Sequence, residues 1–381
     1  MKKIFVSALA FDEGKSGISN YTENSVYNLA SNNSIDVAIL QKDINNYTRK
    51  HSNIHFIVYP NILKHTLLNL LFHFFILPFL ISTKYDFIFL PAANRRLMFF
   101  YPIYTIATFH DLSQFHIRGK YDLFRMLYIR YFIPMFLKGV DKIIAVSHNT
   151  KADMLKYLKL KDDDIVVNTN GYDKELYDMP EIDLAQQNRV SPFQKYILYI
   201  SRIEHPGKNH INLIKAYELL PCEIRKEYSL VLVGSDCENA QAVHDYVNTS
   251  KYKTSIQFLG FVENSAMPTL ISNAQIFVFP SLYEGFGIPL IEAMAMNVPT
   301  LCASNSSLFE IGKGVSLFFD EYDEVSIQQA MTKVIKDKNL QAQMKEAGLK
   351  RAKLYDWRSH ANNIINLYEE NKLLQYSKTF C

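Results

Sequence analysis

Glu284 and Glu292 stand eight residues apart around a glycine-containing loop, and their carboxylates could accept hydrogen bonds from the hydroxyl groups of a ligand. The preceding residues 276–280 are continuously apolar, as in a strand that is buried on both faces. Residues 289–296 have helix-forming composition with proline in the first turn. Because side chains in the first turn lean toward the amino end of a helix, both carboxylates can face the crevice beyond the strand.

The loop between these glutamates could bind an anion. Gly285 and Gly287 would let the backbone approach a ligand closely. The amide groups around Phe286, Gly287 and Ile288, where the helix begins, favour an anionic group such as a phosphate. Carboxylate acceptors beside an anion-binding helix start suit the hydroxyls and phosphates of a sugar nucleotide.

Two cations follow a second apolar stretch. Arg202 comes directly after residues 196–200, which read as a buried strand, and Lys208 lies six residues further on. Both can therefore reach the same crevice and neutralise a diphosphate leaving group. The alternative is a surface charge pair at a helix start. We interpret the neighbouring His205 and His210 as structural or solvent-facing.

The order of these segments resembles the retaining glycosyltransferases of family 4, which have the GT-B fold. A lone glutamate pair at this spacing also occurs by chance on solvated helices, so the accompanying segments carry the resemblance. It covers nearly the whole chain and rests on residues 168–173, 196–210, 230–234, 258–262 and 279–295.

The resemblance assigns a role to each residue of the second half. It implies that Arg202 and Lys208 contact the phosphates of the donor. Glu292 matches the residue that bonds the ribose, and Glu284 matches the acidic residue at the transferred sugar. Gly260 would border the base pocket, with a plain strand end as the alternative.

The first half contributes two further candidates. His110 ends the apolar residues 104–109 and should face the cleft from the carboxyl end of a strand. It resembles the family histidine near a donor-sugar hydroxyl or the developing positive centre, and a structural histidine is the alternative. Gly17 begins a helix, and its family counterpart lets the backbone approach the sugar nucleotide. The chain departs from the pattern here, because many members carry a glycine pair where it has Lys15, Ser16 and Gly17.

Strand-like and helical segments alternate along the chain, which predicts the α/β class with two doubly wound parallel sheets. The expected strands are residues 4–9, 35–40, 55–59, 87–91, 104–109, 142–147 and 165–168 in the first half, and 196–200, 230–234, 257–260, 276–280 and 300–303 in the second. We expect Rossmann-like domains over residues 1–174 and 196–356, facing each other across a cleft, with residues 175–195 as the linker. The resemblance implies that a helix in residues 357–381 returns to the first domain.

The composition is that of an ordinary globular protein, with 381 residues, 48% hydrophobic and 21% charged. A net charge of +3 is too mild to indicate a nucleic-acid partner by itself. Four cysteines without Cys-x-x-Cys spacing fit a reducing cytosol. The amino terminus resembles a signal peptide only briefly, and we interpret residues 4–9 as the first core strand.

The resemblance implies a retaining transferase that needs no metal or other cofactor. Arg202, Lys208 and the loop amides would stabilise the departing diphosphate. No protein nucleophile is evident, and the family is thought to use a same-face route in which a diphosphate oxygen accepts the proton of the acceptor. A glycosidase-type carboxylate pair does not fit, because the resemblance puts Glu292 at the ribose. Residues 162–164 are all aspartate and match a metal-binding motif, but their charged loop favours a turn.

Residues 66–81 are strongly apolar and aromatic, yet they fall short of the roughly 18 to 20 residues that cross a bilayer. A packing helix is one interpretation. The other is a surface that rests on anionic lipid, because basic and aromatic residues interleave nearby. They are Arg95, Arg96, Arg118, Lys120, Arg125, Arg130 and Lys138 with Phe99, Phe100, Tyr101, Phe124, Tyr128, Tyr131 and Phe132. We predict peripheral contact with an anionic membrane rather than a nucleic-acid groove.

These features together predict a cytoplasmic enzyme of surface-polysaccharide or O-antigen synthesis, working at the inner face of the plasma membrane. The preferred donor is GDP-mannose, with dTDP-rhamnose or a UDP-hexose as alternatives, and the expected acceptor is a lipid-linked oligosaccharide. Other polysaccharide-assembly enzymes are possible partners. A catalytically silent glycan-binding GT-B subunit is disfavoured by the intact candidate residues, and a phosphorylase of the same fold is disfavoured because no cofactor-lysine context is recognisable.

Overall fold

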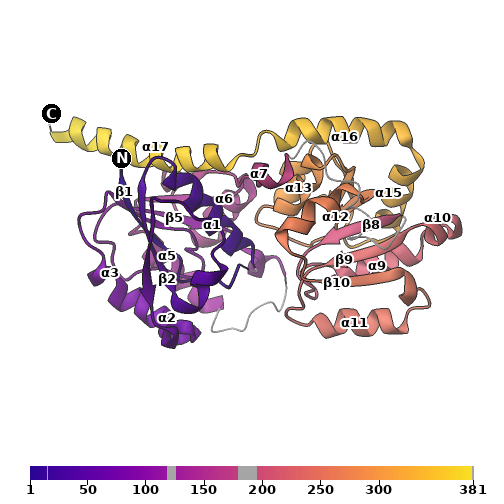
Figure 1. The fold of residues 1–381 in the computed structure, drawn as a ribbon, viewed down its shortest axis with the longest axis horizontal. Helices are drawn as coiled ribbons and strands as arrows, with labels where there is room; N and C mark the ends of the chain where they lie inside the picture. Colours follow the sequence, from indigo (N-terminus) through magenta and orange to yellow (C-terminus); the bar gives the residue numbers. More distant parts are fainter. Residues whose placement is uncertain (15, 118–125, 179–194, 380–381) are drawn as a thin grey trace. The chain divides into compact units, whose positions relative to one another are not determined.

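The computed structural model describes residues 1–379 except 15, 118–125 and 179–194 (Figure 1). The chain divides into two compact units. The first contains Met1–Phe115, Gly119–Gly171 and Asp356–Cys381, and the second contains His116–Arg118 and Tyr172–Tyr355. Each unit is described by itself.

The first unit is built on a seven-stranded sheet in the order β3-β2-β1-β4-β5-β6-β7, and all of its strand pairs are parallel. The strands are β1 (Lys3–Ser7), β2 (Ser34–Leu40), β3 (Ile54–Tyr59), β4 (Phe87–Leu90), β5 (Thr105–Phe109), β6 (Lys142–Ala145) and β7 (Ile165–Val167). The central strands are short apolar runs whose residues are almost all buried, as expected where helices cover both faces of a sheet. The strand order reverses between β1 and β4.

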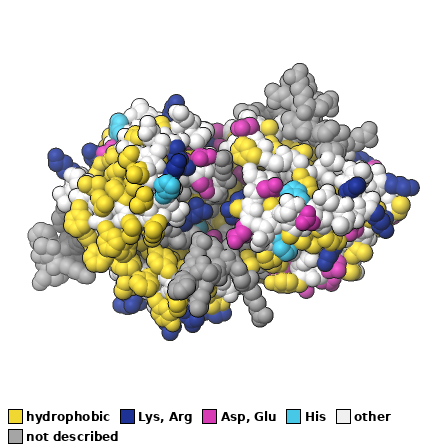
Figure 2. Space-filling view, turned by 90° about the horizontal axis from the view of Figure 1, so that it is seen from below, with side chains coloured by type: hydrophobic (Ala, Val, Ile, Leu, Met, Phe, Trp, Pro, Cys, Tyr) yellow, Lys and Arg dark blue, Asp and Glu magenta, His cyan; other side chains and the backbone are white. Residues whose placement is uncertain are grey.

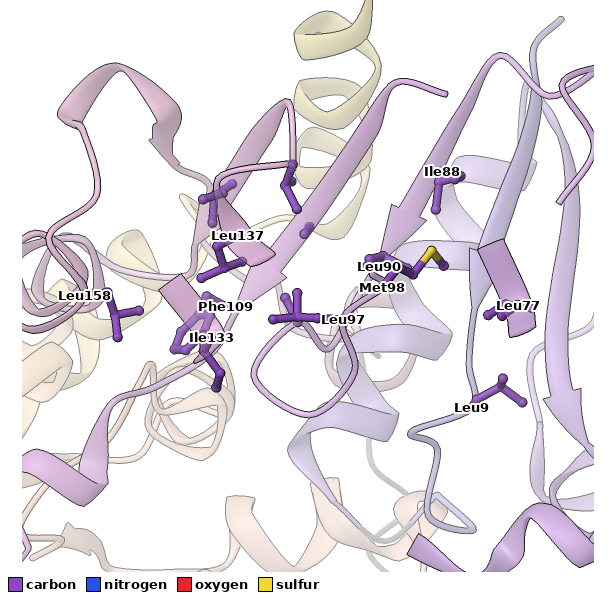
Figure 3. Close-up of a cluster of buried hydrophobic side chains, with 14 of the residues drawn as sticks. Leu9, Leu77, Ile88, Leu90, Leu97, Met98, Phe109, Ile133, Leu137 and Leu158 are labelled. Atoms are coloured by element: carbon purple, nitrogen blue, oxygen red, sulfur yellow. The ribbon is translucent and has the colours of Figure 1, made fainter. Parts of the chain in front are cut away.

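The α-helices described in this unit are α1 (Gly17–Ala30), α2 (Thr66–Leu71), α3 (Leu77–Leu80), α5 (Ile133–Leu137), α6 (His148–Asp153) and α17 (Trp357–Thr379). Figure 3 shows part of the core, in which Leu90 and Phe109 from the strands lie among Leu77, Ile133 and Leu137 from the helices. One continuous apolar cluster therefore joins the sheet to helices α3 and α5.

The terminal helix α17 packs against α1 within the first unit. The Tyr21 hydroxyl donates to Nε2 of His360 at 2.9 Å, because Nδ1 of His360 must carry its proton to bond the Thr169 carbonyl at 3.0 Å. The rings of Tyr21 and Trp357 meet edge to face with centroids 5.6 Å apart. Contacts between residues far apart in the chain thus attach this helix.

The second unit has a six-stranded sheet in the order β10-β9-β8-β11-β12-β13, and its strand pairs are also parallel. Its strands are β8 (Tyr196–Ile200), β9 (Ser229–Val233), β10 (Ile256–Gly260), β11 (Ile276–Phe279), β12 (Thr300–Ala303) and β13 (Leu317–Phe319). Its helices are α7 (Lys174–Tyr177), α9 (His210–Glu218), α10 (Cys222–Glu227), α11 (Ala240–Thr249), α12 (Met267–Ser272), α13 (Ile288–Ala295), α14 (Ser306–Gly312), α15 (Glu324–Lys336) and α16 (Lys338–Ala352).

The α/β class and the two doubly wound parallel sheets predicted from the sequence are confirmed. The edge strand β13 was missed, because three residues are too few to show a period. The expected linker at 175–195 falls mostly outside the described residues, and its first residues form part of α7 in the second unit. Within the described part of the chain, no helix is long and apolar enough to cross a membrane.

Candidate active site

The main candidate site of the second unit lies beyond the carboxyl ends of β8 and β11. These neighbouring strands mark the point where the strand order reverses, which is where open α/β sheets bind their ligands. Arg202 and Lys208 follow β8, and Glu284 and the glycine loop follow β11. The parallel sheet therefore brings together two sequence segments that are about 80 residues apart.

Hydrogen bonds join the loops after β8 and β11. The Leu282 amide donates to the Gly207 carbonyl at 3.0 Å, and Nδ2 of Asn209 donates to the Pro280 carbonyl at 3.0 Å. The buried amide of Asn209 also donates to the Glu321 carbonyl at 2.7 Å. These bonds hold the site in place before a ligand arrives, which reduces the ordering that binding must supply.

Lys208 and Glu284 form an ion pair in this site. Nζ of Lys208 lies 2.7 Å from Oε1 of Glu284, and the side chains are 18% and 14% exposed. The Glu284 amide donates to Oγ of Ser306 at 3.1 Å, which fixes the backbone beneath the carboxylate. The sequence placed both residues at a ligand, and the structure adds that each is the other's partner, so an anionic ligand would compete with Glu284 for the ammonium group.

Arg202 has a carboxylate of its own. Its Nη2 atom lies 3.1 Å from Oε2 of Glu204, whose side chain is almost entirely buried. A β-carbon at Gly207 would lie 3.0 Å from Oε1 of the same glutamate. Arg202 and Lys208 therefore extend from one loop, each beside a different glutamate. The role of Glu204 was missed from the sequence, where its only signal is its place two residues after Arg202.

The loop after β11 ends in an open helix start. Gly287 has φ 115°, and a β-carbon there would lie 2.9 Å from Cδ2 of Leu308, so both backbone and packing require glycine. No side chain among the described residues caps the amino end of α13, which begins at Ile288. Pro289 has no amide hydrogen and the Leu290 amide donates to the Gly287 carbonyl at 3.1 Å, so the amides that can bind an anion here are those of Gly287 and Ile288. Phe286 contributes backbone only, because its ring is buried against Tyr355 with centroids 5.6 Å apart.

Glu292 is buried on α13 and bonds the hydroxyl of Tyr177 on α7. The pKa of Glu292 is raised to about 7, chiefly by burial; the Tyr177 bond lowers it and the negative charge of Asp173 raises it by smaller amounts. A large fraction of these carboxyls is protonated near neutral pH as a result. A ligand hydroxyl that donates to Glu292 would favour the ionised form. Tyr177 was not among the predicted residues, because nothing local marks it as a partner of Glu292.

Gly260 lies apart from the Lys208 and Glu284 pair. It ends β10 at the edge of the sheet, and β9 lies between β10 and β8. Its carbonyl accepts a hydrogen bond from the Gly234 amide at 2.8 Å. Its role at a base pocket stays a prediction.

Gly17 and His110 belong to the first unit. Gly17 begins α1, and the ring of Tyr21 on the same helix packs against His110. Ser16 caps the start of this helix, and a β-carbon at Gly17 would meet nothing within 4 Å. Oδ1 of Asp12 accepts hydrogen bonds from Ser16 and Ser19 and fixes the loop before the helix. The space at Gly17 leaves its backbone open to approach. Lys15 lies outside the described residues.

His110 is buried at the end of β5 as a neutral imidazole. Its Nε2 atom lies 2.6 Å from the Pro91 carbonyl oxygen, which can only accept, so Nε2 carries the proton. Burial lowers the pKa of His110 to about 4. The Tyr21 ring packs edge to face on the imidazole, with centroids 4.6 Å apart. At neutral pH, Nδ1 therefore has a lone pair that can accept a hydrogen bond but cannot donate a proton.

His210 and the aspartate run 162–164 both have structural surroundings, as interpreted from the sequence. His210 is buried at the start of α9, where burial lowers its pKa to about 3, and its Nε2 lies 3.3 Å from Oγ of Ser201. Asp162–Asp164 forms a short turn before β7, and Asp162 pairs with Lys151 at 3.0 Å. Among the described residues, no three His, Cys, Asp or Glu side chains are grouped so that they could hold a metal ion.

Family comparisons identify the class of protein. Residues 15–176 match the model described as Glycosyltransferase Family 4, and residues 182–351 match the model described as Glycosyl transferases group 1. Between them these matches span nearly the whole chain. The chain therefore belongs to the family 4 glycosyltransferases, which is the family that the sequence motifs resemble.

The chain is also similar to individual glycosyltransferases. The chain is 29% identical to O-antigen chain mannosyltransferase B of Escherichia coli over 266 residues, which are 69% of this chain and 70% of that protein. It is 27% identical to the serotype-specific mannosyltransferase WbdA of Escherichia coli over 288 residues, 73% of this chain but 34% of that longer protein. The structure of Anabaena Alr3699/HepE in complex with UDP and glucose matches with a TM-score of 0.73 at 14% identity, covering 97% of this chain and 100% of that one. This last likeness establishes the GT-B fold.

Proposed function

We propose that this glycosyltransferase is a retaining mannosyltransferase that moves mannose from GDP-mannose to a lipid-linked glycan in O-antigen synthesis, at the cytoplasmic face of the membrane. The observation that carries the proposal is the grouping of Lys208, Glu284 and the open start of α13 beyond β8 and β11. A cation and free helix amides suit a diphosphate, and a carboxylate beside them suits sugar hydroxyls. The names of both Escherichia coli relatives support mannose as the sugar, and the name of O-antigen chain mannosyltransferase B supports a role in O-antigen synthesis.

In the proposed reaction, negative charge builds on the departing diphosphate. Lys208, Arg202 and the amides of Gly287 and Ile288 stabilise that charge from fixed positions, which lowers the barrier without reorganisation. The diphosphate draws Lys208 away from Glu284, which leaves this carboxylate able to accept from hydroxyls of the transferred sugar. Glu292 accepts from the ribose, and Nδ1 of His110 accepts from a hydroxyl of the sugar substrate. The leaving diphosphate oxygen takes the proton of the acceptor, so the reaction needs no cofactor.

The activity is tested with a panel of sugar nucleotides and lipid-linked acceptors, read by nucleotide release and product mass. GDP-mannose is expected to turn over fastest, and NMR of the product should show that the anomeric configuration is retained. Faster turnover with dTDP-rhamnose or a UDP-hexose would replace the donor; the UDP and glucose bound by HepE make a UDP-hexose the second candidate. Glycan binding without turnover of any donor would favour a silent binding subunit.

Two substitutions test the diphosphate assignment. Arg202→Ala and Lys208→Ala should each lower kcat/KM by about 100-fold, as expected when one fixed donor to a developing charge is lost. The matched control is Lys336→Ala, which breaks a 3.2 Å ion pair with Glu223 on an exposed surface of the same unit. The control should retain full activity. Unchanged rates in both site variants would overturn the assignment of Arg202 and Lys208 to the diphosphate.

A further inference from the structure

The apolar segment at residues 66–80 turns its polar side chains inward. Asn69 lies on α2 with 2% of its surface exposed. Its Nδ2 donates to the carbonyls of Leu9 at 3.1 Å and Leu63 at 3.0 Å, and its Oδ1 accepts from Nε of Arg96 at 2.6 Å. The amide of this asparagine is therefore fully used inside the protein.

His73, one turn further on, is completely buried. Its Nδ1 donates to the Leu97 carbonyl at 3.1 Å, so Nε2 accepts from Oγ of Ser7 at 2.9 Å. Burial lowers the pKa of His73 to about 3, so the imidazole is neutral. Rotating the segment to hide its apolar side would leave the polar partners of Asn69 and His73 unsatisfied in the core, which is costly.

The opposite side of the segment exposes large apolar side chains as a result. Leu67 is 66% exposed and Phe79 is 75% exposed. Their exposed neighbours on the same segment are Leu68, Leu71, Phe75, Ile76 and Leu80. Scattered exposed apolar residues need no explanation, but a contiguous group marks an interaction surface.

A second segment extends this surface. The ring of Phe74 lies 4.5 Å from that of Phe136 on α5, and the ring of Phe99 lies 6.1 Å from that of Phe75 (centroid distances). Exposed apolar residues on or next to these elements are Phe99, Leu127, Tyr131, Phe132 and Met135. We call the exposed residues of both segments the apolar face. Figure 2, which views the molecule from below, shows hydrophobic side chains covering much of the first unit on the side where α2 lies in Figure 1, with Lys and Arg at the edges.

Both segments contain the same succession of helical elements. A wide helical turn, Phe72–Ile76 or Tyr128–Phe132, precedes a short helix with proline in its first turn. Pro78 has no amide hydrogen, so the Phe74 carbonyl is left without its usual helical donor. It accepts instead from the Phe99 amide at 3.0 Å. This bond joins the segment to the loop that carries the neighbouring aromatic rings.

The charged residues within the stretches that carry the apolar face have one sign. Residues 61–81, 95–103 and 126–139 contain no aspartate or glutamate. Lys64, Arg130 and Lys138 are exposed within these stretches. Arg118, Lys120, Phe124 and Arg125 lie outside the described residues. Apolar and aromatic side chains accompanied by exposed cations on the same described stretches fit an anionic lipid surface, where the apolar side chains enter the headgroup boundary and the cations contact phosphates.

We infer that the apolar face docks the first unit on an anionic lipid bilayer, with Leu67, Phe75 and Phe79 inserted at the headgroup boundary. The segment lies in the interface and does not cross it, in keeping with the absence of a membrane-crossing helix among the described residues. This inference does not rest on the proposed donor or acceptor, and its test needs neither.

The first experiment uses the full chain and vesicles of phosphatidylcholine with or without phosphatidylglycerol. The protein should sediment with the anionic vesicles. The pair Leu67→Ser and Phe79→Ser should lower the partition coefficient at least tenfold, and Lys64→Gln with Lys138→Gln should remove the preference for phosphatidylglycerol. The control pair is Leu219→Ser with Leu354→Ser, which removes apolar side chains of similar exposure from the second unit and should bind as wild type.

A second experiment locates the inserted residue. The chain has one tryptophan, Trp357, which is buried, so Phe79→Trp adds one reporter whose signal is read by difference from the wild type. Its fluorescence should shift to the blue and be quenched by brominated lipids, whereas Leu354→Trp should show neither. Equal vesicle binding by the wild type and by the variant with Leu67→Ser and Phe79→Ser would overturn the inference, and so would no binding of either protein. So would dimerisation through this face without lipid binding, which would identify a second copy as its occupant. Unchanged thermal unfolding of the serine variants would show that a loss of binding is not a loss of fold.

Discussion

The buried carboxyl of Glu292 should make the protein less stable as pH rises, and Glu292→Gln should remove that dependence. The pKa of Glu292 is raised from its ordinary value of 4.5 to about 7, chiefly by burial. Between these pH values the unfolded chain has lost its proton here while the folded chain keeps it, so the free energy of unfolding falls as pH rises. One pKa unit corresponds to about 1.4 kcal/mol, so the loss is about 3 kcal/mol and is complete above pH 7.

Glutamine has nearly the same shape, stays neutral, and keeps an oxygen that accepts from Tyr177. The variant should therefore match the wild type near pH 4.5 and exceed it by about 3 kcal/mol at pH 8.5, as measured by urea unfolding at both pH values. Comparing the two proteins at each pH cancels the contributions of His110 and the other buried histidines. The control is Glu263→Gln, an exposed glutamate of the same unit, which should follow the wild type at both pH values.

The same substitution separates stability from ligand binding. If Glu292 accepts from the ribose as a carboxylate, Glu292→Gln should raise the KM for the donor while it stabilises the protein at high pH. An equal stability difference at pH 4.5 and 8.5 would refute the proposed cost of ionisation. A gain in stability with unchanged donor KM would refute only the ribose contact.

Two further predictions concern residues that position the site. Gly234→Ala should lower the free energy of unfolding by about 3 kcal/mol or more, because a β-carbon there would lie 2.0 Å from the Ser201 carbonyl oxygen and φ is 142°. In the same urea titration, Gly17→Ala should change the free energy of unfolding by less than about 1 kcal/mol. Similar midpoints for both variants would contradict the packing argument. If ionisation of Glu292 sets the KM for the donor, this KM should change with pH near 7. Tyr177→Phe removes a bond that lowers the pKa of Glu292, so the pH at which the KM changes should move upward. A KM profile that does not move would show that this hydroxyl does not act on Glu292.

Much of the fold follows from local features of the sequence. Continuous apolar runs of four or five residues predicted several of the strands, because a strand covered by helices on both faces has no polar side. Gly287 was predicted from its place between a strand and a helix, and the structure shows why glycine is required there. The family motifs assigned Arg202, Lys208, Glu284 and Glu292 to one domain, and all four lie in the second unit.

Only the tertiary structure decided which of these side chains meet. Lys208 bonds Glu284 from 76 residues away, because the order of parallel strands brings distant chain segments to one edge of a sheet. Tyr21 bonds His360 from 339 residues away, because helices α1 and α17 pack against each other. Tyr177 has no local signal as a partner of Glu292, because the two residues lie on different helices. The segment at residues 66–80 makes the contrast plainest. Its sequence is apolar enough for a core helix, but buried partners of Asn69 and His73 hold its polar side inward, so its leucines and phenylalanines face outward.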